Sequence, residues 1–187
     1  EREGSGGRSV HANGSQATLV EPPLAVALTG SPGTGKTTIA TLAMEAGWRV
    51  TTVTALAEKH GLILEPDDDE ARPIDIDELA SVVEFDVPIL IDGHLSHLLP
   101  VGVSAIIRCA PSVLEGRLQS REYPSWKIKS NVEWEMVGGP WGDKPNGRVA
   151  EFDSTHVSPQ TLWMDIEKWI SSGAPDCHPY IDWLSSS

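Results

Sequence analysis

Cysteine and long apolar runs are both scarce in this chain of 187 residues. The two cysteines are Cys109, inside an apolar run, and Cys177, near the end, and they offer no disulfide framework. No apolar run approaches the length of a membrane span. The first 23 residues also lack the apolar core of a secretory signal. We therefore expect no membrane association and a cytoplasmic location.

Basic residues are few as well: 14 Lys and Arg stand against 27 Asp and Glu, for a formal net charge of −13. Contacts to a phosphate backbone need Lys and Arg, so this balance argues against a general nucleic-acid-binding surface and against direct DNA binding. An acidic surface leaves room for a basic protein partner, although solubility alone would account for it. The acidic run at 67–70, within the acidic segment 65–86, is where we expect such a partner to dock.

What is present is the pattern of one globular domain, with 40% hydrophobic residues and enough length for a core. Residues 1–22 are rich in Gly and Ser and indicate a flexible arm; the domain covers 23–173 and a tail covers 174–187. Strands are expected at 24–28, 49–53, 88–91, 104–109 and 149–152. Helices are expected at 36–46, 55–60, 75–84, 111–121, 125–137 and 159–170, with a loop at 138–147. This alternation predicts a three-layer α/β sandwich around a central five-stranded parallel sheet.

Residues 30–37 read GSPGTGKT and match the phosphate-binding pattern G-x-x-x-x-G-K-[S/T] in full. The loop follows an apolar run and opens a helix, whose N-terminus favours an anion. Its glycines let backbone N–H groups surround the β-phosphate, Lys36 reaches the β- and γ-phosphates, and the Thr37 hydroxyl binds Mg²⁺. The predicted nucleotide-binding residues are Gly30, Ser31, Pro32, Gly33, Thr34, Gly35, Lys36, Thr37 and Thr38. We expect a P-loop NTPase that binds ATP with Mg²⁺.

A second motif, ILIDGH at 89–94, ends another apolar run on Asp92 and places His94 two residues later. Ligands of parallel sheets bind at the carboxyl ends of strands, so Asp92 can lie beside the P-loop and hold Mg²⁺, directly or through water. His94 would then reach the γ-phosphate or the acceptor. The alternative for His94 is a surface histidine or a helix cap, and we prefer that alternative for His97, one turn further on.

Five of the 14 basic residues fall within 108–129, in a chain that is otherwise acidic. Phosphoryl transfer needs cations near the charge on the transferred group, so this cluster suits a small lid over the phosphates. Arg117 and Arg121 are four residues apart and are expected on one helix face, with ion pairs to Glu115 or Glu122 as the alternative. The other members are Arg108, Lys127 and Lys129. The predicted catalytic residues are Lys36, Asp92, His94, Arg117 and Arg121, and the predicted metal ligands are Thr37 and Asp92.

These motifs together resemble the adenylate kinase-like family that includes the type-6 adenylate kinase of eukaryotes and its archaeal counterparts. The resemblance covers residues 24–172, is nearest to the archaeal members, and has four features beyond the P-loop. They are Asp-x-His at 92–94, Asp-x-Asp at 75–77 followed by Leu79, a short lid with Arg121, Tyr123, Lys127, Asn131 and Glu135, and FDST at 152–155 followed by Ser158 and Pro159. The chain departs from the family at 52–55, where Thr52, Thr54 and Ala55 replace Asn and Gly-Asp, and at 138–147, which interrupts the lid helix.

The resemblance implies a nucleoside-monophosphate kinase-like fold, with a monophosphate-binding insertion at about 54–84 and a short lid at about 117–135. It implies transfer of the γ-phosphate of ATP to AMP, together with ATPase activity. It also implies a role in maturation of the small ribosomal subunit, with the platform protein eleven of that subunit as partner. Two alternatives stay open: an NTP-dependent assembly switch with little kinase activity, and a small-metabolite kinase, such as one for shikimate or gluconate.

Overall fold

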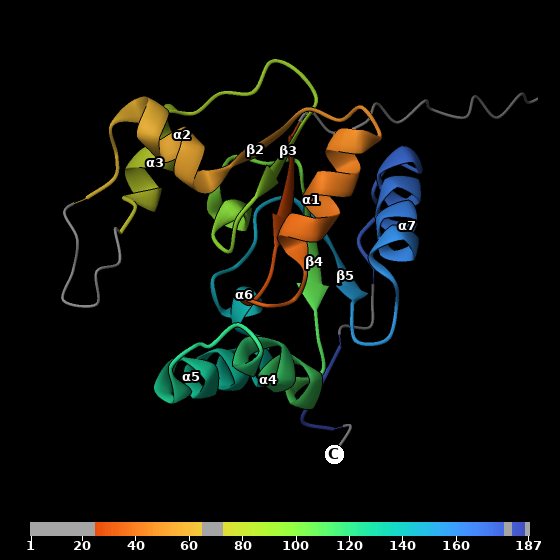
Figure 1. The fold of residues 1–187 in the computed structure, drawn as a ribbon. Helices are drawn as coiled ribbons and strands as arrows, with labels where there is room; N and C mark the ends of the chain where they lie inside the picture. Colours follow the sequence, from red (N-terminus) through yellow and green to blue (C-terminus); the bar gives the residue numbers. More distant parts are fainter. Residues whose placement is uncertain (1–24, 65–72, 178–180, 186–187) are drawn as a thin grey trace, which may run out of the picture.

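Five parallel strands form the centre of the protein in the computed structural model, which describes residues 25–64, 73–177 and 181–185 (Figure 1). The strands are β1 (Ala25–Thr29), β2 (Val50–Thr52), β3 (Ile89–Asp92), β4 (Val103–Arg108) and β5 (Arg148–Asp153). Their order across the sheet is β2-β3-β1-β4-β5, and the register places Leu28 beside both Asp92 and Ala105. The predicted five-stranded parallel sheet is confirmed. The predicted arm at 1–22 and the acidic run at 67–70 lie outside the described residues.

The helices of the described chain begin and end close to their predicted positions. They are α1 (Lys36–Glu45), α2 (Val53–His60), α3 (Ile76–Val82), α4 (Pro111–Gln119), α5 (Ser125–Met136), α6 (Gly139–Gly142) and α7 (Pro159–Ser171), with a 3₁₀ helix η1 (Ser96–Leu98). Val53, expected in a strand, begins α2 because the Thr52 hydroxyl caps this helix by accepting from the Ala55 N–H at 3.0 Å. The predicted loop at 138–147 contains α6, which begins after Gly138 in a left-handed conformation (φ 68°).

The sheet is covered on both faces, because successive side chains of a strand point to opposite sides. On one face, Val26 and Leu28 of β1 pack with α1 and α7. On the other, Ala25 and Ala27 pack with α2 and α3. Figure 1 shows α1 and α7 together on one side of the strands and α2 with α3 on another. These layers explain why β1 is an unbroken apolar run rather than an alternating one.

Helices α4 and α5 pack against each other beyond the carboxyl end of β4, below the sheet in Figure 1. Their shared apolar cluster contains Cys109, Leu114, Leu118 and Ile128. The P-loop leaves the sheet at the same end, so the two helices stand next to the phosphate-binding segment. No helix in the described ranges is long and apolar enough to cross a membrane.

The described part of the C-terminal tail lies along β5, the outer strand on that side of the sheet. The indole N–H of Trp169 donates to the Pro175 carbonyl at 2.8 Å. Both backbone groups of Val149 are bound by the tail: its N–H donates to Asp176 Oδ1 at 2.6 Å, and its carbonyl accepts from the Cys177 N–H at 3.1 Å. Residues 181–185, which we call the C-terminal segment, then reach the end of the sheet where α4 and α5 lie (Figure 1).

Candidate functional site

The P-loop connects β1 to α1 and is pressed against β4. Gly30 has a positive φ of 134°, and a Cβ there would lie 2.3 Å from the carbonyl oxygen of Ile107, so only glycine fits. Gly35 precedes α1, and no described side chain caps that helix. The first N–H groups of α1 are therefore available to an anion, which the helix dipole also favours.

Lys36 lies inside the loop that it terminates. Its Nζ donates to the carbonyls of Gly30 and Ser31, both at 2.8 Å, and the residue is 9% exposed. Burial lowers the pKa of Lys36 to about 8, while the charges of Asp92 and Glu135 act in the opposite direction. At neutral pH the ammonium is therefore mostly charged and is held where a triphosphate would meet the loop.

Thr37 and Asp92 bring two oxygen atoms together beside Lys36. The Thr37 hydroxyl donates to Asp92 Oδ2 at 3.0 Å, although the two residues come from α1 and β3. Burial raises the pKa of Asp92, and the hydrogen bond from Thr37 and the charge of Lys36 oppose the shift. Hydroxyl and carboxylate oxygens are ligands that suit Mg²⁺. Because the described residues contain no cluster of three or more His, Cys, Asp or Glu able to hold a metal, further ligands would be phosphates and water.

A cavity of about 680 Å³ opens over these groups. Lys36, Thr37 and Asp92 line its floor beside Thr52 and Thr54, and His94, Arg121 and Tyr123 complete the wall. The pKa of His94 is lowered, first by partial burial among its neighbours and then by the charges of Lys36 and His97. The imidazole is thus neutral at pH 7, with a ring nitrogen able to accept a hydrogen bond.

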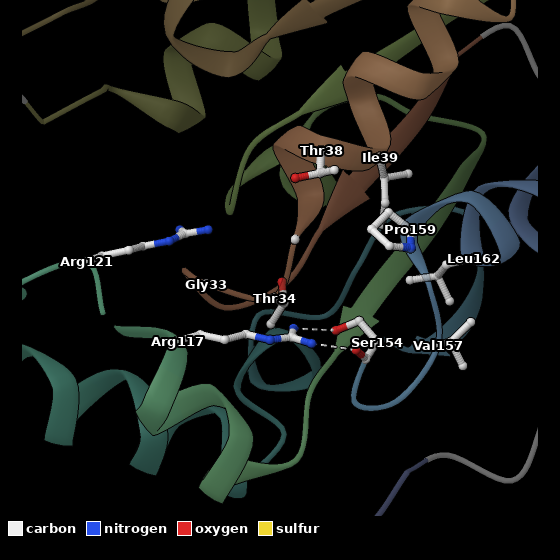
Figure 2. Close-up of a pocket in the computed structure, with 11 residues that line it drawn as sticks. Gly33, Thr34, Thr38, Ile39, Arg117, Arg121, Ser154, Val157, Pro159 and Leu162 are labelled. Carbon is white, nitrogen blue, oxygen red and sulfur yellow. Dashed lines mark hydrogen bonds between the residues drawn. The ribbon is translucent and has the colours of Figure 1, made fainter. Parts of the chain in front are cut away.

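A second pocket of about 270 Å³ adjoins the P-loop on its other side (Figure 2). Its apolar wall consists of Ile39, Val157, Pro159 and Leu162. Arg117 lies across it, donating from Nη1 to the Ser154 hydroxyl at 3.1 Å and from Nη2 to the Ser154 carbonyl at 2.7 Å. A fixed planar guanidinium facing an apolar wall provides a slot for a flat aromatic ring.

The side chains of Arg117 and Arg121 thus line different parts of the site. Arg121 lines both pockets and points toward the P-loop in Figure 2, whereas Arg117 lines only the smaller one. Neither forms an ion pair with Glu115 or Glu122 in the described structure, where the four ion pairs involve other residues.

Arg108, the first member of the basic cluster at 108–129, is buried in ion pairs and is not available to the phosphates. It is 1% exposed and paired with Glu135, at 2.7 Å from Nε, and with Glu151. It differs from the other members of the cluster because it ends a buried strand and faces the carboxylates of neighbouring elements. Lys127 lies 5.5 Å above the Tyr123 ring. Lys129 is exposed and pairs within its own helix.

His97 was expected at the surface or as a helix cap, and that expectation is wrong. The residue is 1% exposed, and its Nδ1 lies 2.7 Å from the hydroxyl of Thr29, the last residue of β1. Its Nε2 is 3.6 Å from Asp143 Oδ2. His97 therefore helps to hold the strand from which the P-loop departs.

This burial predicts a dependence of stability on pH. Burial lowers the pKa of His97 below its usual value, with Asp143 acting in the opposite direction. At about pH 6.5 His97 therefore takes up a proton in the unfolded chain more readily than in the folded chain. Because the unfolded state then binds more protons, the free energy of unfolding should fall as pH drops below about 6.5. Urea unfolding from about pH 7.5 to 5.5 should show a shallower loss for His97→Gln. An equal slope in both proteins would contradict the prediction.

Sequence reasoning missed the positions of Glu135 and Ser154 relative to the site. Glu135 accepts a hydrogen bond from the Ser31 hydroxyl of the P-loop at 2.6 Å. Ser154 holds Arg117 in the smaller pocket. In the sequence both stand out only through the family resemblance, because no local pattern relates them to partners 104 and 37 residues away.

Comparison with known proteins identifies a family and relatives of this chain. A family model described as "AAA domain" matches residues 26–138. A protein of Archaeoglobus fulgidus named "Putative adenylate kinase" is 38% identical over 166 residues, which cover 86% of this chain and 92% of that protein. A protein of the same name from Thermococcus onnurineus is 37% identical over 164 residues, which cover 84% of this chain and 90% of that protein.

Solved structures are similar in fold. A gluconokinase from Sinorhizobium meliloti has a TM-score of 0.54 at 16% identity, with 80% of this chain and 93% of that chain covered. A sugar kinase from Janibacter has a TM-score of 0.53 at 20% identity, with 82% of this chain and 98% of that chain covered. At such identities the likeness concerns the fold alone, and the predicted α/β P-loop NTPase fold is confirmed.

Proposed function

Because the chain belongs to the P-loop family described as the AAA domain, and is related over most of its length to archaeal proteins named "Putative adenylate kinase", we propose that it is an adenylate kinase that transfers the γ-phosphate of ATP to AMP. It hydrolyses ATP when water replaces the acceptor. The observation that carries the proposal is the pair of adjoining pockets, which share Arg121 and the P-loop.

The smaller pocket would take the adenine of ATP. Its apolar wall at Ile39 and Pro159 matches one face of a purine, and the Arg117 guanidinium, fixed by Ser154, can stack on the other. From there the triphosphate would follow the P-loop into the larger cavity, where Lys36 lies.

In that cavity, Thr37 and Asp92 would hold Mg²⁺. The bound ion neutralises charge that develops on the phosphates. Arg121 contributes a cation from the α4 side, so that Lys36 and Arg121 both face the transferred group.

His94 would position the acceptor. It comes two residues after Asp92, and its neutral imidazole can accept a hydrogen bond from an attacking water or position the phosphate of AMP. Thr52 and Thr54 line the cavity on the α2 side, where the acceptor would enter. The Thr52 hydroxyl already caps α2, which leaves that of Thr54 for the substrate.

The cellular role belongs to the proposal through the family resemblance. We extend it to maturation of the small ribosomal subunit, with the platform protein eleven as partner. A basic ribosomal protein would be drawn to a chain with a net charge of −13, because opposite charges accelerate encounter.

Acceptor dependence tests the activity. ADP formation should be measured with ATP and Mg²⁺ alone, with added AMP, and with added gluconate or shikimate. We expect AMP to raise ADP formation steeply, with two ADP produced for each AMP consumed. Lys36→Ala, purified in the same way, serves as the control for contaminating kinases. Equal turnover with and without AMP would identify an ATPase or an assembly switch, and a response to the sugar acids would identify a metabolite kinase.

A further inference from the structure

Glu135 of α5 is a fully buried carboxylate in direct contact with the P-loop. Its Oε2 accepts from the Ser31 hydroxyl at 2.6 Å. Its Oε1 accepts from Arg108 Nε at 2.7 Å and from the Cys109 N–H at 3.2 Å. A carboxylate with donors on both oxygens, one of them a guanidinium, is held in one orientation. Ser31 is thereby tied to a helix 104 residues further along the chain.

Ser31 in turn holds two other groups of the P-loop. Its carbonyl accepts from the Thr34 hydroxyl at 2.9 Å and from Lys36 Nζ at 2.8 Å. A shift of Ser31 therefore moves the group on which Lys36 rests. Because an anion cradle binds well only when its donors are already aligned, freedom at Ser31 has to be removed when a nucleotide binds.

The C-terminal segment supplies a further donor to this carboxylate. The indole N–H of Trp183 donates to Glu135 Oε1 at 3.0 Å, and the ring lies 5.8 Å from Arg108 Cζ. The Ile181 carbonyl accepts a hydrogen bond from Arg108 Nη1 at 3.2 Å, and the Ile181 N–H donates to Glu151. The segment thus contacts the ion pairs that Arg108 makes with both carboxylates.

We propose that Glu135 is a positioning residue of the nucleotide site and that the C-terminal segment, through Trp183, sets how firmly Glu135 holds Ser31. The inference rests on the proposed nucleotide binding at the P-loop and adds the end of the chain to that site. When the segment leaves, Glu135 loses a donor, and Ser31 gains freedom that ATP must remove. Affinity for ATP falls, whereas phosphoryl transfer from the saturated protein is little changed, because bound ATP has already realigned the loop.

The first test is Trp183→Phe, which removes the indole N–H but keeps an aromatic ring near Arg108. Titration calorimetry with ATP should show a Kd about three- to tenfold weaker, as expected for one lost hydrogen bond. The KM for ATP should rise in parallel, with kcat at saturating ATP nearly unchanged. Leu184→Ala, at a neighbouring residue that is 59% exposed, is the matched control and should bind ATP like the wild type.

A double-mutant cycle separates this route from a general loss of stability. Ser31→Ala removes the hydroxyl through which the C-terminal segment is proposed to act. In that background, Trp183→Phe should change the Kd for ATP by less than about twofold, because the coupling between the two residues has already been removed. A full, additive effect of Trp183→Phe in the Ser31→Ala protein would overturn the proposal.

Hydrogen exchange on the wild-type protein supplies a test that needs no variant. Coupling between two sites is reciprocal, so ATP should slow exchange in the peptide containing the Ile181 N–H, which is bound to Glu151. Unchanged exchange there in ATP-saturated protein would refute the coupling, as would a Trp183→Phe protein with the wild-type Kd. In both cases the proposed function stands. A wild-type protein that binds no ATP would instead remove the proposed function itself.

Discussion

Replacing Lys36 by alanine should weaken ATP binding by about one to two orders of magnitude and lower turnover by a further factor of about 10² or more. Lys36 is 9% exposed, and its ammonium rests on the carbonyls of Gly30 and Ser31. It can pass from these carbonyls to the β- and γ-phosphates with little movement of the loop. A hydrogen bond to a charged group contributes more than a neutral one, and its effect grows as charge builds up on the transferred phosphate.

Equilibrium titration and steady-state assays would measure the two effects separately. Lys59→Ala, at an exposed position in α2, is the control for removal of a positive charge from this acidic chain. Thermal unfolding of both variants without nucleotide shows whether Lys36→Ala remains folded. Turnover at the wild-type rate in the Lys36→Ala protein would refute the assignment of 30–37 as the nucleotide-binding loop.

His94→Ala should keep the ATP affinity of the wild type within a few-fold and lose about 10²- to 10⁴-fold in phosphoryl transfer, hydrolysis, or both. The side chain lines the larger cavity but is not part of the P-loop, so it contributes to the acceptor rather than to binding of the triphosphate. His60→Ala, at an exposed position of α2, is the matched control. If His94→Ala turns over ATP normally with and without AMP, the histidine has no part in the reaction.

The dependence of kcat/KM on pH should also change in His94→Ala. Burial and the charge of Lys36 lower the pKa of His94, so protonation of the free enzyme should begin to reduce kcat/KM only below about pH 6.5. That acidic limb should be missing in His94→Ala. A limb of the same shape in both proteins would have to come from another group.

The sequence predicts most accurately those features of the site that depend on residues close together in the chain. GSPGTGKT contains its own turn, its lysine and its helix start, and a parallel sheet places the strand end at Asp92 on the same edge as this loop. Residues whose partners are far along the chain could not be placed in this way. Arg108 counts among the basic residues of 108–129 in the sequence, and nothing nearby reveals its partners Glu135 and Glu151.

The two arginines after β4 illustrate a second limit. A spacing of four residues predicts one helix face, but α4 ends at Gln119 and Arg121 lies beyond it. The guanidinium of Arg117 turns to Ser154, and that of Arg121 turns to the larger cavity. A shift of a helix end by two residues therefore separates the proposed adenine contact of Arg117 from the proposed phosphate contact of Arg121. Periodicity alone does not locate helix ends so closely.

The hydrogen bonds that Val149 makes with Asp176 and Cys177 also bear on how separate molecules meet in solution. β5 is the last strand of the sheet on its side, and an outer strand with free N–H and carbonyl groups is a template for a strand from another molecule. Here the chain itself takes both groups of Val149. The tail thus occupies this position of the sheet edge, and a protein cut before Pro175 would leave the N–H and carbonyl of Val149 open to a strand from another copy.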